Sequence, residues 1–230
     1  MPERVALIIP ALNEEETIGL TLDGLRGQPL AQIIVADNGS TDRTAQAARA
    51  HGAQVVQEPR RGYGQACLAG IAALEAGISI VVFMDGDASD DPADLPHLLA
   101  PIERSEADLV IGSRVRGRCE PGALTPQQRF GNRVFTFLLR ILFGARATDL
   151  GPFRAIRRAA LDQLGMADTN YGWTIEMQIK AARKGLRVAE IPVNYRKRRG
   201  GKAKVAGSLR GSIFAGAKIS WIVLRYWLKK

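Results

Sequence analysis

The apolar run Ile78 to Met84, which ends abruptly in acidic residues, constrains the fold of this chain most. It is long enough for a buried strand, and aspartates follow at positions 85, 87, 90 and 91. Ligands of open α/β sheets bind at the carboxyl ends of the strands. Asp85 and Asp87 are separated only by Gly86, so both side chains can face one hard divalent cation. A plain acidic turn explains the segment equally well, because Asp, Ser and Pro are common turn residues.

Strand-like and helix-like segments alternate along the chain, and this order predicts an α/β fold. Apolar runs predict strands at 5–10, 33–36, 55–56, 78–84 and 107–112. Alternating strands and helices of this length form a mostly parallel, doubly wound sheet. We therefore expect a Rossmann-like sheet flanked by helices. Beyond it we expect a loop over 115–128 and a further helix from Arg129 to Phe143.

The chain of 230 residues carries a formal net charge of +9 that is unevenly distributed. Residues 183–230 hold 14 Lys and Arg against one acid, Glu190, so this tail has a charge of +13 and the preceding body about −4. A basic tail suits nucleic acid, an anionic membrane surface or phosphorylated substrates. The two cysteines are too few for a disulfide scaffold, so we expect a reducing compartment.

The end of the tail has the pattern of a basic amphipathic helix. Apolar residues recur at helical spacing from Leu209 to Leu228, and Trp221, Tyr226 and Trp227 accompany basic residues. Such a helix can lie on a membrane surface, whereas a spanning helix needs about 18 uncharged apolar residues. Packing against the sheet or a partner chain is an equally good explanation. Because the amphipathic spacing favours lipid over nucleic acid, we expect an anionic membrane surface and no nucleic acid as a partner. The sequence leaves open whether the chain forms a homo-oligomer.

The ends of three expected strands carry polar residues that would meet at one edge of a parallel sheet. They are Pro10 to Glu14, Asp37-Asn38 and Asp85 to Asp87. Such an edge can bind a base and ribose through short polar groups, and a diphosphate through a divalent cation. The segment Gly62-Tyr63-Gly64 lacks the third glycine of the dinucleotide-binding fingerprint and follows a weak strand. We therefore reject a nicotinamide cofactor.

Several short motifs occur in a characteristic order. They are Pro10-Ala-Leu-Asn-Glu14, Asp37-Asn-Gly-Ser-Thr-Asp42, Met84-Asp-Gly-Asp87, Gly112-Ser-Arg114, Thr148-Asp149, Phe153-Arg154, Glu176 and Glu190-Ile-Pro-Val193. This ordered set resembles the family 2 glycosyltransferases, most closely the dolichyl-phosphate mannose synthase type, from Val5 to about Val205. The resemblance implies a GT-A fold, a nucleoside-diphosphate sugar donor, Mg²⁺ or Mn²⁺, and often a polyprenyl phosphate acceptor.

By position, the resemblance also implies roles for individual residues. It implies a nucleoside pocket lined by Pro10, Leu12, Glu14, Ala36, Asp37 and Asn38. It implies that Asp85-Gly86-Asp87 is the metal-bearing motif, with Asp87 as the first choice of ligand. Ser89 stands where the family commonly has a Gln that assists the metal site, and Leu12 stands where an aromatic residue is frequent. The nucleotide base and the metal geometry therefore stay open, with Asp85, Asp87 and Ser89 as the metal candidates.

Basic residues complete the set that the resemblance implies. Arg114 corresponds to an Arg near the reactive phosphates, and Arg198 and Lys202 lie in the cationic segment before the terminal helix. A divalent ion acts as a Lewis acid on the departing diphosphate, and Arg donors neutralise its growing charge. A phosphate acceptor is already anionic, so an in-line, inverting attack needs positioning rather than a base.

A hydroxyl acceptor would need a general base, for which the sequence offers Asp149 or Glu176. A structural salt bridge with a neighbouring Arg explains either acid at least as well. The catalytic candidates are Asp87, Arg114, Asp149 and Glu176.

The sequence thus predicts an inverting glycosyltransferase that moves a hexose from a UDP- or GDP-linked sugar to a dolichyl or undecaprenyl phosphate. Transfer to a soluble or protein-bound hydroxyl is one alternative, and a noncatalytic nucleotide-sugar-binding scaffold is another. We expect residues 1–205 to form the catalytic domain and residues 206–230 the terminal helix. We further expect a peripheral protein on the cytoplasmic face of a membrane.

Overall fold

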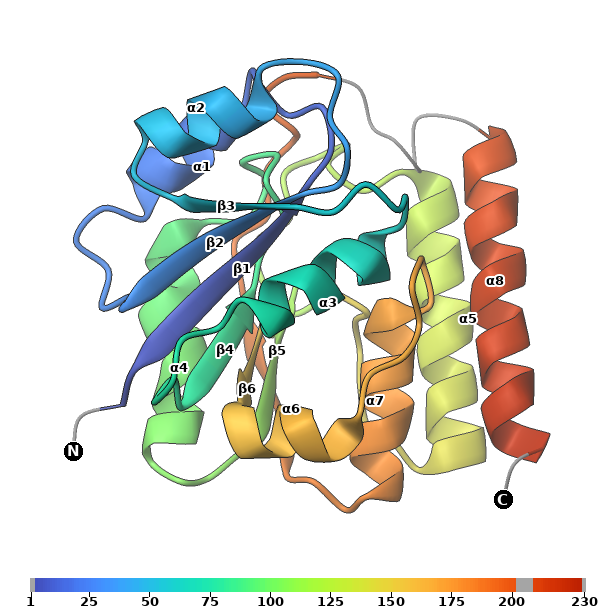
Figure 1. Ribbon diagram of the computed structural model, residues 1–230. Helices are drawn as coiled ribbons and strands as arrows, with labels where there is room; N and C mark the ends of the chain where they lie inside the picture. Colours follow the sequence, from blue (N-terminus) through green and yellow to red (C-terminus); the bar gives the residue numbers. More distant parts are fainter. Residues whose placement is uncertain (1–2, 202–208, 229–230) are drawn as a thin grey trace.

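A seven-stranded sheet forms the centre of the part of the chain that the structure describes, residues 3–201 and 209–228 of a computed structural model (Figure 1). The strand order is β3-β2-β1-β4-β6-β5-β7. The strands are β1 (Val5–Ala11), β2 (Gln32–Asp37), β3 (Gln54–Gln57), β4 (Ile80–Phe83), β5 (Leu109–Ser113), β6 (Arg154–Arg157) and β7 (Val188–Pro192). The helices are α1 (Ile18–Gly24), α2 (Thr44–Ala50), α3 (Tyr63–Ala72), the 3₁₀ turn Pro92–Asp94, α4 (Leu95–Glu103), α5 (Pro126–Phe143), α6 (Arg158–Leu164), α7 (Trp173–Arg183) and α8 (Leu209–Leu228).

The sheet is mostly parallel, as the alternating pattern predicts. Strand β6 runs antiparallel to both of its neighbours, β4 and β5, while the other neighbouring strands pair in parallel. Arg154 at the start of β6 pairs with Phe83 at the end of β4. The chain has therefore returned to the carboxyl edge of the sheet before β6 begins, which explains its reversed direction. The predicted α/β class is confirmed.

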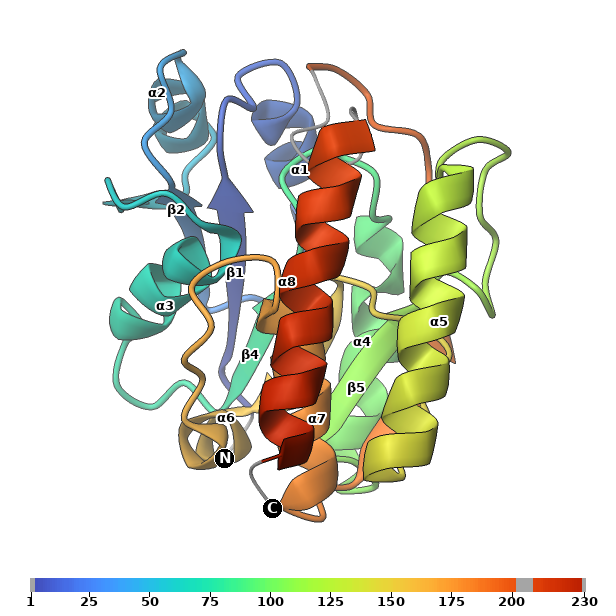
Figure 2. The same ribbon diagram turned by 90° about the vertical axis from the view of Figure 1, so that its right-hand side faces the viewer.

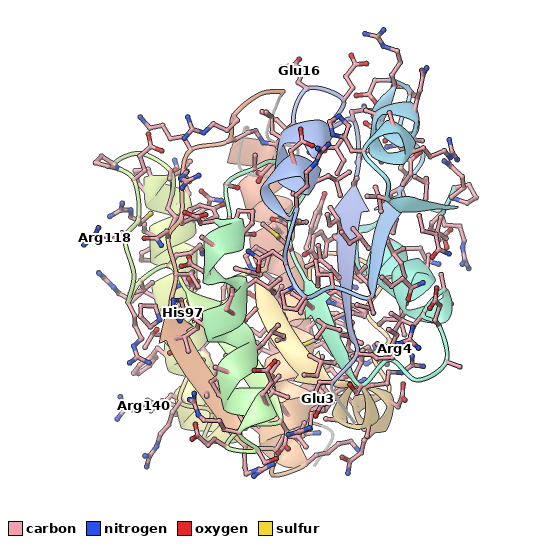
Figure 3. The ribbon with its side chains drawn as sticks, turned by 90° about the vertical axis from the view of Figure 1, so that its left-hand side faces the viewer. Glu3, Arg4, Glu16, His97, Arg118 and Arg140 are labelled. Carbon is pink, nitrogen blue, oxygen red and sulfur yellow. The ribbon has the colours of Figure 1, made fainter. Side chains whose placement is uncertain are left out.

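Both faces of the sheet are covered by helices, which explains why its central strands are continuous apolar runs. Side chains alternate along a strand, so Leu7 and Ile9 of β1 pack with α1, α2 and α4. Ala6 and Ile8 pack on the other face with α3, α6 and α7. Figure 3 shows Glu16 at the edge where β1 ends, with Glu3 and Arg4 at the opposite edge.

A third apolar cluster joins α8 to α5 and α7. It consists of Phe135, Leu139, Ile175, Ile179, Ile222 and Val223. Figure 2 shows α8 and α5 side by side on one flank of the molecule. Trp221, Leu224, Trp227 and Leu228 lie on the other side of α8 and are exposed. The predicted terminal helix is thus present, and one side of it packs against the body while the other faces outward.

None of the helices within the described residues is long and apolar enough to cross a membrane. The expected domain boundary at 205/206 lies outside the described residues.

Helix α5 begins at Pro126, three residues before the predicted start at Arg129. The Thr125 side chain accepts a hydrogen bond from the Gln128 backbone, and the Gln128 side chain accepts one from Thr125 N–H. This reciprocal capping box fixes the first turn, a signal that the apolar spacing alone does not contain.

Candidate active site

The carboxyl edge of the sheet opens into a cleft of about 720 Å³. The predicted site residues that line it are Pro10, Leu12, Glu14, Asn38, Asp85, Gly86, Asp87, Arg114 and Arg198. Ends of β1, β2, β4 and β5 supply most of them, as expected for parallel strands. Apolar residues, including Leu150, Pro152, Ala215 and Ile219, also line the cleft. The last two belong to α8, so the terminal helix forms part of the wall.

The loops after β1 and β2 hold each other by hydrogen bonds. Glu14 N–H donates to the Thr44 hydroxyl at 2.7 Å, and Asn13 N–H donates to the Ser40 hydroxyl at 2.9 Å. Asn38 Oδ1 accepts from Gly62 N–H at 2.7 Å. This predicted nucleoside residue therefore also anchors the loop before α3.

Two predicted nucleoside residues lie in β2 behind the cleft wall. Ala36 is fully buried, and Asp37 is 3% exposed and accepts a hydrogen bond from Ser40 N–H at 3.0 Å. Lys202 lies outside the described residues.

Three carboxylates crowd the end of β4. Burial and the nearby Asp87 carboxylate raise the pKa of Asp85, and burial and Asp85 raise the pKa of Asp90. Asp90 is 1% exposed, and its Oδ1 has no hydrogen-bond partner among the described residues. Closely spaced carboxylates that repel one another favour a cation between them.

These acids do not form a complete metal cage. Within residues 3–201 and 209–228, no three His, Cys, Asp or Glu side chains are arranged to hold a metal ion. Mg²⁺ is usually bound by one or two protein carboxylates and completes its coordination with water and substrate phosphates. The donor set of Asp85 and Asp87 therefore fits a hard divalent ion that arrives with a diphosphate.

Each acid of the Asp85-Gly86-Asp87 motif is held by a neighbouring hydroxyl. Tyr63 Oη donates to Asp85 Oδ1 at 3.1 Å. The Ser89 hydroxyl and backbone N–H both donate to Asp87 Oδ1. Ser89 is 1% exposed, and its hydroxyl contacts Asp87 and Tyr195. Gly86 lies close to β1, because a Cβ there would stand 3.1 Å from Ile9 Cγ2.

Arg198 connects the loop after β1 to the acidic motif. Its guanidinium bonds Glu14 Oε2 at 2.5 Å and Oε1 at 2.9 Å. It also lies 3.3 Å from Asp87 Oδ2. A predicted substrate-binding Arg thus stands beside the predicted metal ligand, and both line the cleft.

Arg114 is held in the cleft by Asp149. Its Nη2 lies 2.7 Å from Asp149 Oδ1 and its Nε 2.9 Å from Oδ2, a bidentate pair. The guanidinium also lies over the Tyr195 ring, 5.1 Å from its centroid. Asp149 is fully buried and both of its oxygens are occupied. In this arrangement Asp149 orients Arg114 instead of presenting a free base.

Glu176 fastens α8 to the body of the protein. Its carboxylate accepts from Tyr226 Oη at 2.7 Å and from Asp168 N–H at 2.7 Å, and Lys180 Nζ lies at 2.8 Å. Burial opposes ionisation of Glu176, but these hydrogen bonds prevail and lower its pKa. At 1% exposure, Glu176 has structural partners, although its ion pair is with Lys180 and not with the neighbouring Arg expected for both candidate bases, whereas Asp149 does pair with an Arg.

Sequence reasoning missed Tyr63 and Tyr195 as site residues. Tyr195 follows the Glu190–Val193 motif by two positions, and Tyr63 lies inside the Gly62–Gly64 segment, which the sequence suggests only as an incomplete dinucleotide fingerprint. Their closeness to these segments is the signal that points to both residues. The partners, Asp85 for Tyr63 and Arg114 for Tyr195, cannot be inferred from spacing.

A comparison with protein families decides the class. The model of glycosyl transferase family 2 matches residues 6–165. The chain belongs to glycosyl transferase family 2. An uncharacterized glycosyltransferase of Mycobacterium tuberculosis is 44% identical to it over 93% of this chain and 94% of the relative. An undecaprenyl-phosphate mannosyltransferase of Micrococcus luteus is 32% identical over 90% of each chain.

Solved structures agree with this family membership. Glucosyl-3-phosphoglycerate synthase from Mycobacterium tuberculosis, solved with Mn²⁺, UDP and glucosyl-3-phosphoglycerate, superposes with a TM-score of 0.78. The sequences are 26% identical, and the match covers 97% of this chain and 80% of that one. The predicted GT-A fold and glycosyltransferase class are thereby confirmed. The expected divalent cation is supported by that complex, which contains Mn²⁺.

We predict that Glu176→Gln lowers the free energy of unfolding of this glycosyltransferase by about 1–3 kcal/mol, because a buried, hydrogen-bonded charge loses part of its partners. The matched control is Glu75→Gln, which removes an exposed pair with Arg4 and should change stability by less than about 0.5 kcal/mol. Denaturant unfolding measures both. A Glu176→Gln protein that is as stable as the wild type but inactive in transfer would instead identify Glu176 as a chemical group.

Proposed function

We propose that this glycosyltransferase moves a hexose from a UDP- or GDP-linked sugar to a polyprenyl phosphate, with inversion, on the cytoplasmic face of a membrane. The observation that carries the proposal is that α8 both lines the cleft and exposes aromatic residues at the surface. Its Ala215 and Ile219 line the cleft, while its Trp221 and Trp227 are exposed. One helix can therefore join the reacting end of a lipid phosphate to the surface that holds its tail.

The donor half of the proposed site lies along the ends of β1 and β4. The nucleoside rests against Pro10 and Leu12, and Asp85 and Asp87 hold Mg²⁺ or Mn²⁺ on the diphosphate side. A bound divalent ion supplies Lewis-acid stabilisation of the leaving group. Arg114, whose direction Asp149 fixes, donates hydrogen bonds to the departing diphosphate and neutralises part of its charge.

The acceptor half lies toward Leu150, Pro152 and α8. A phosphate oxygen of the acceptor attacks the anomeric carbon from the face opposite the diphosphate. The new C–O bond forms as the old one breaks, and the nucleoside diphosphate leaves with the electron pair. Because the attacking oxygen is already anionic, no base is needed. The occupied carboxylates of Asp149 and Glu176 support this choice over a hydroxyl acceptor.

A phosphorylated soluble acceptor is the second candidate. The structural likeness to glucosyl-3-phosphoglycerate synthase, at a TM-score of 0.78, favours it. The exposed aromatic residues of α8 favour the lipid, since a soluble acceptor leaves them without a role.

A transfer assay tests the acceptor. Purified protein, Mn²⁺ and radiolabelled UDP- and GDP-hexoses are incubated with a short polyprenyl phosphate, and organic extraction measures the labelled lipid. We expect extractable product with polyprenyl phosphate and none with the matched polyprenol, because the alcohol lacks the anionic nucleophile. Equal transfer to polyprenol would contradict the pre-ionised acceptor. Product only with 3-phosphoglycerate would replace the lipid by the soluble candidate, and donor binding without any transfer would support the scaffold alternative.

The proposed membrane surface comprises α8 and α5. On α5, Phe130, Phe137 and Ile141 are 71%, 62% and 64% exposed and recur at helical spacing. They belong to α5, the helix that Figure 2 shows beside α8. Exposed Arg133, Arg140 and Arg225 accompany the apolar side chains, and Figure 3 shows Arg140 pointing outward. Apolar residues with interspersed cations suit the interface of an anionic bilayer.

We predict that the double variant Trp221→Ser/Trp227→Ser lowers the membrane association constant, measured by sedimentation with anionic liposomes, by at least about tenfold, which corresponds to a loss of about 1.4 kcal/mol of membrane affinity. The control is Leu20→Ser, which removes an apolar side chain that is 56% exposed on α1 and should leave sedimentation unchanged. Equal binding of wild type and the double variant would rule out α8 as the contact.

A further inference from the structure

The Gly62-Tyr63-Gly64 segment, which does not form a dinucleotide site, lies against the acidic motif. Tyr63 begins α3 and lines the cleft. Its hydroxyl reaches across to Asp85 Oδ1 at 3.1 Å. The residues are 22 positions apart in the chain, so only the fold brings them together.

The backbone around Tyr63 is fixed from two sides. Gly62 N–H donates to Asn38 Oδ1 at 2.7 Å, and Gln65 N–H donates to the Thr169 carbonyl at 2.9 Å. A Cβ on Gly62 would stand 2.1 Å from the Thr169 carbonyl oxygen, and Gly62 also has a φ of 146°. Only glycine fits that position.

Gly64 is confined in the same way. A Cβ there would stand 2.0 Å from the carbonyl oxygen of Asp168. The loop that includes Asp168 and Thr169 therefore presses directly on the first turn of α3. Close backbone contacts at Gly62 and Gly64 therefore hold the backbone on both sides of Tyr63.

We propose that Tyr63 is a positioning residue for the donor site: its hydroxyl holds the Asp85 carboxylate ready for the divalent ion and couples it, through Gly62 and Asn38, to the nucleoside side. The inference rests on the proposed function, because it requires a metal–diphosphate complex at Asp85 and Asp87. It deepens that function by assigning a role to a residue outside the motif.

Electrostatics explain why Asp85 needs such support. The carboxylates of Asp87 and Asp90 lie near it, and Asp90 Oδ2 accepts a hydrogen bond from Asp85 N–H at 3.4 Å, so an unheld Asp85 side chain would be repelled by both. The Tyr63 hydroxyl donates to Asp85 Oδ1 and limits this displacement. Hydrogen bonds of this kind orient metal ligands, and losing one typically weakens metal affinity about 10- to 100-fold.

The test compares Tyr63→Phe with Tyr226→Phe. Both variants remove a tyrosine hydroxyl that donates to a buried or half-buried carboxylate, but Tyr226 donates to Glu176, in the contact between α8 and the body. Mn²⁺ is titrated at a fixed concentration of UDP, and separately of GDP, and the rise in melting temperature is followed. The measurement is the Mn²⁺ concentration at half-saturation, which requires no turnover.

We expect Tyr63→Phe to raise the Mn²⁺ half-saturation about tenfold or more and to regain the full shift at high Mn²⁺, because Asp85 itself remains. Tyr226→Phe should lower the melting temperature without moving the half-saturation. Equal half-saturation for Tyr63→Phe and wild type, or equal shifts in both variants, would overturn the inference. A wild type whose melting temperature shows no Mn²⁺-dependent response to either nucleotide would overturn the proposed donor site, and the inference with it.

Discussion

The crowding of negative charge at the end of β4 is the constraint on which the rest of the site depends. Burial and the neighbouring carboxylates raise the pKa of Asp85 and of Asp90, so ionising these two acids is costly. The neighbouring groups offset this cost: hydroxyls of Tyr63 and Ser89 hold two of the acids, and Arg198 stands beside Asp87. A divalent ion between Asp85 and Asp87 would lower the repulsion among these acids and present positive charge to an anionic diphosphate.

The terminal helix connects this charged edge to the outside of the molecule. One side of α8 completes the apolar cluster with α5 and α7, and Glu176 anchors it through Tyr226. Its Ala215 and Ile219 line the cleft, and Trp221, Leu224, Trp227 and Leu228 are exposed. The packing and membrane explanations of the tail therefore do not exclude each other. The packed side determines where the helix lies, and the exposed side is what we propose to meet lipid.

The sequence predicts the parts of this structure that depend on local pattern. Apolar runs ending in polar residues identify β1, β2 and β4, and parallel pairing brings their ends to one edge. Pairings between residues that are far apart in the sequence cannot be predicted from such local patterns. Asp149 bonds Arg114 across 35 positions, and Tyr226 bonds Glu176 across 50. The reversed direction of β6 likewise depends on where the chain after α5 returns, which no local spacing encodes.

We propose that the acidic edge binds a nucleoside diphosphate through a divalent ion at Asp87. The Mn²⁺-dependent rise in melting temperature with UDP or GDP tests this binding, since ligands that bind the native state raise apparent stability. Asp87→Ala should lose this rise and keep its fold. Asp91→Ala, which alters an acid that caps the 3₁₀ turn, should retain it. An undiminished rise in Asp87→Ala would contradict the account.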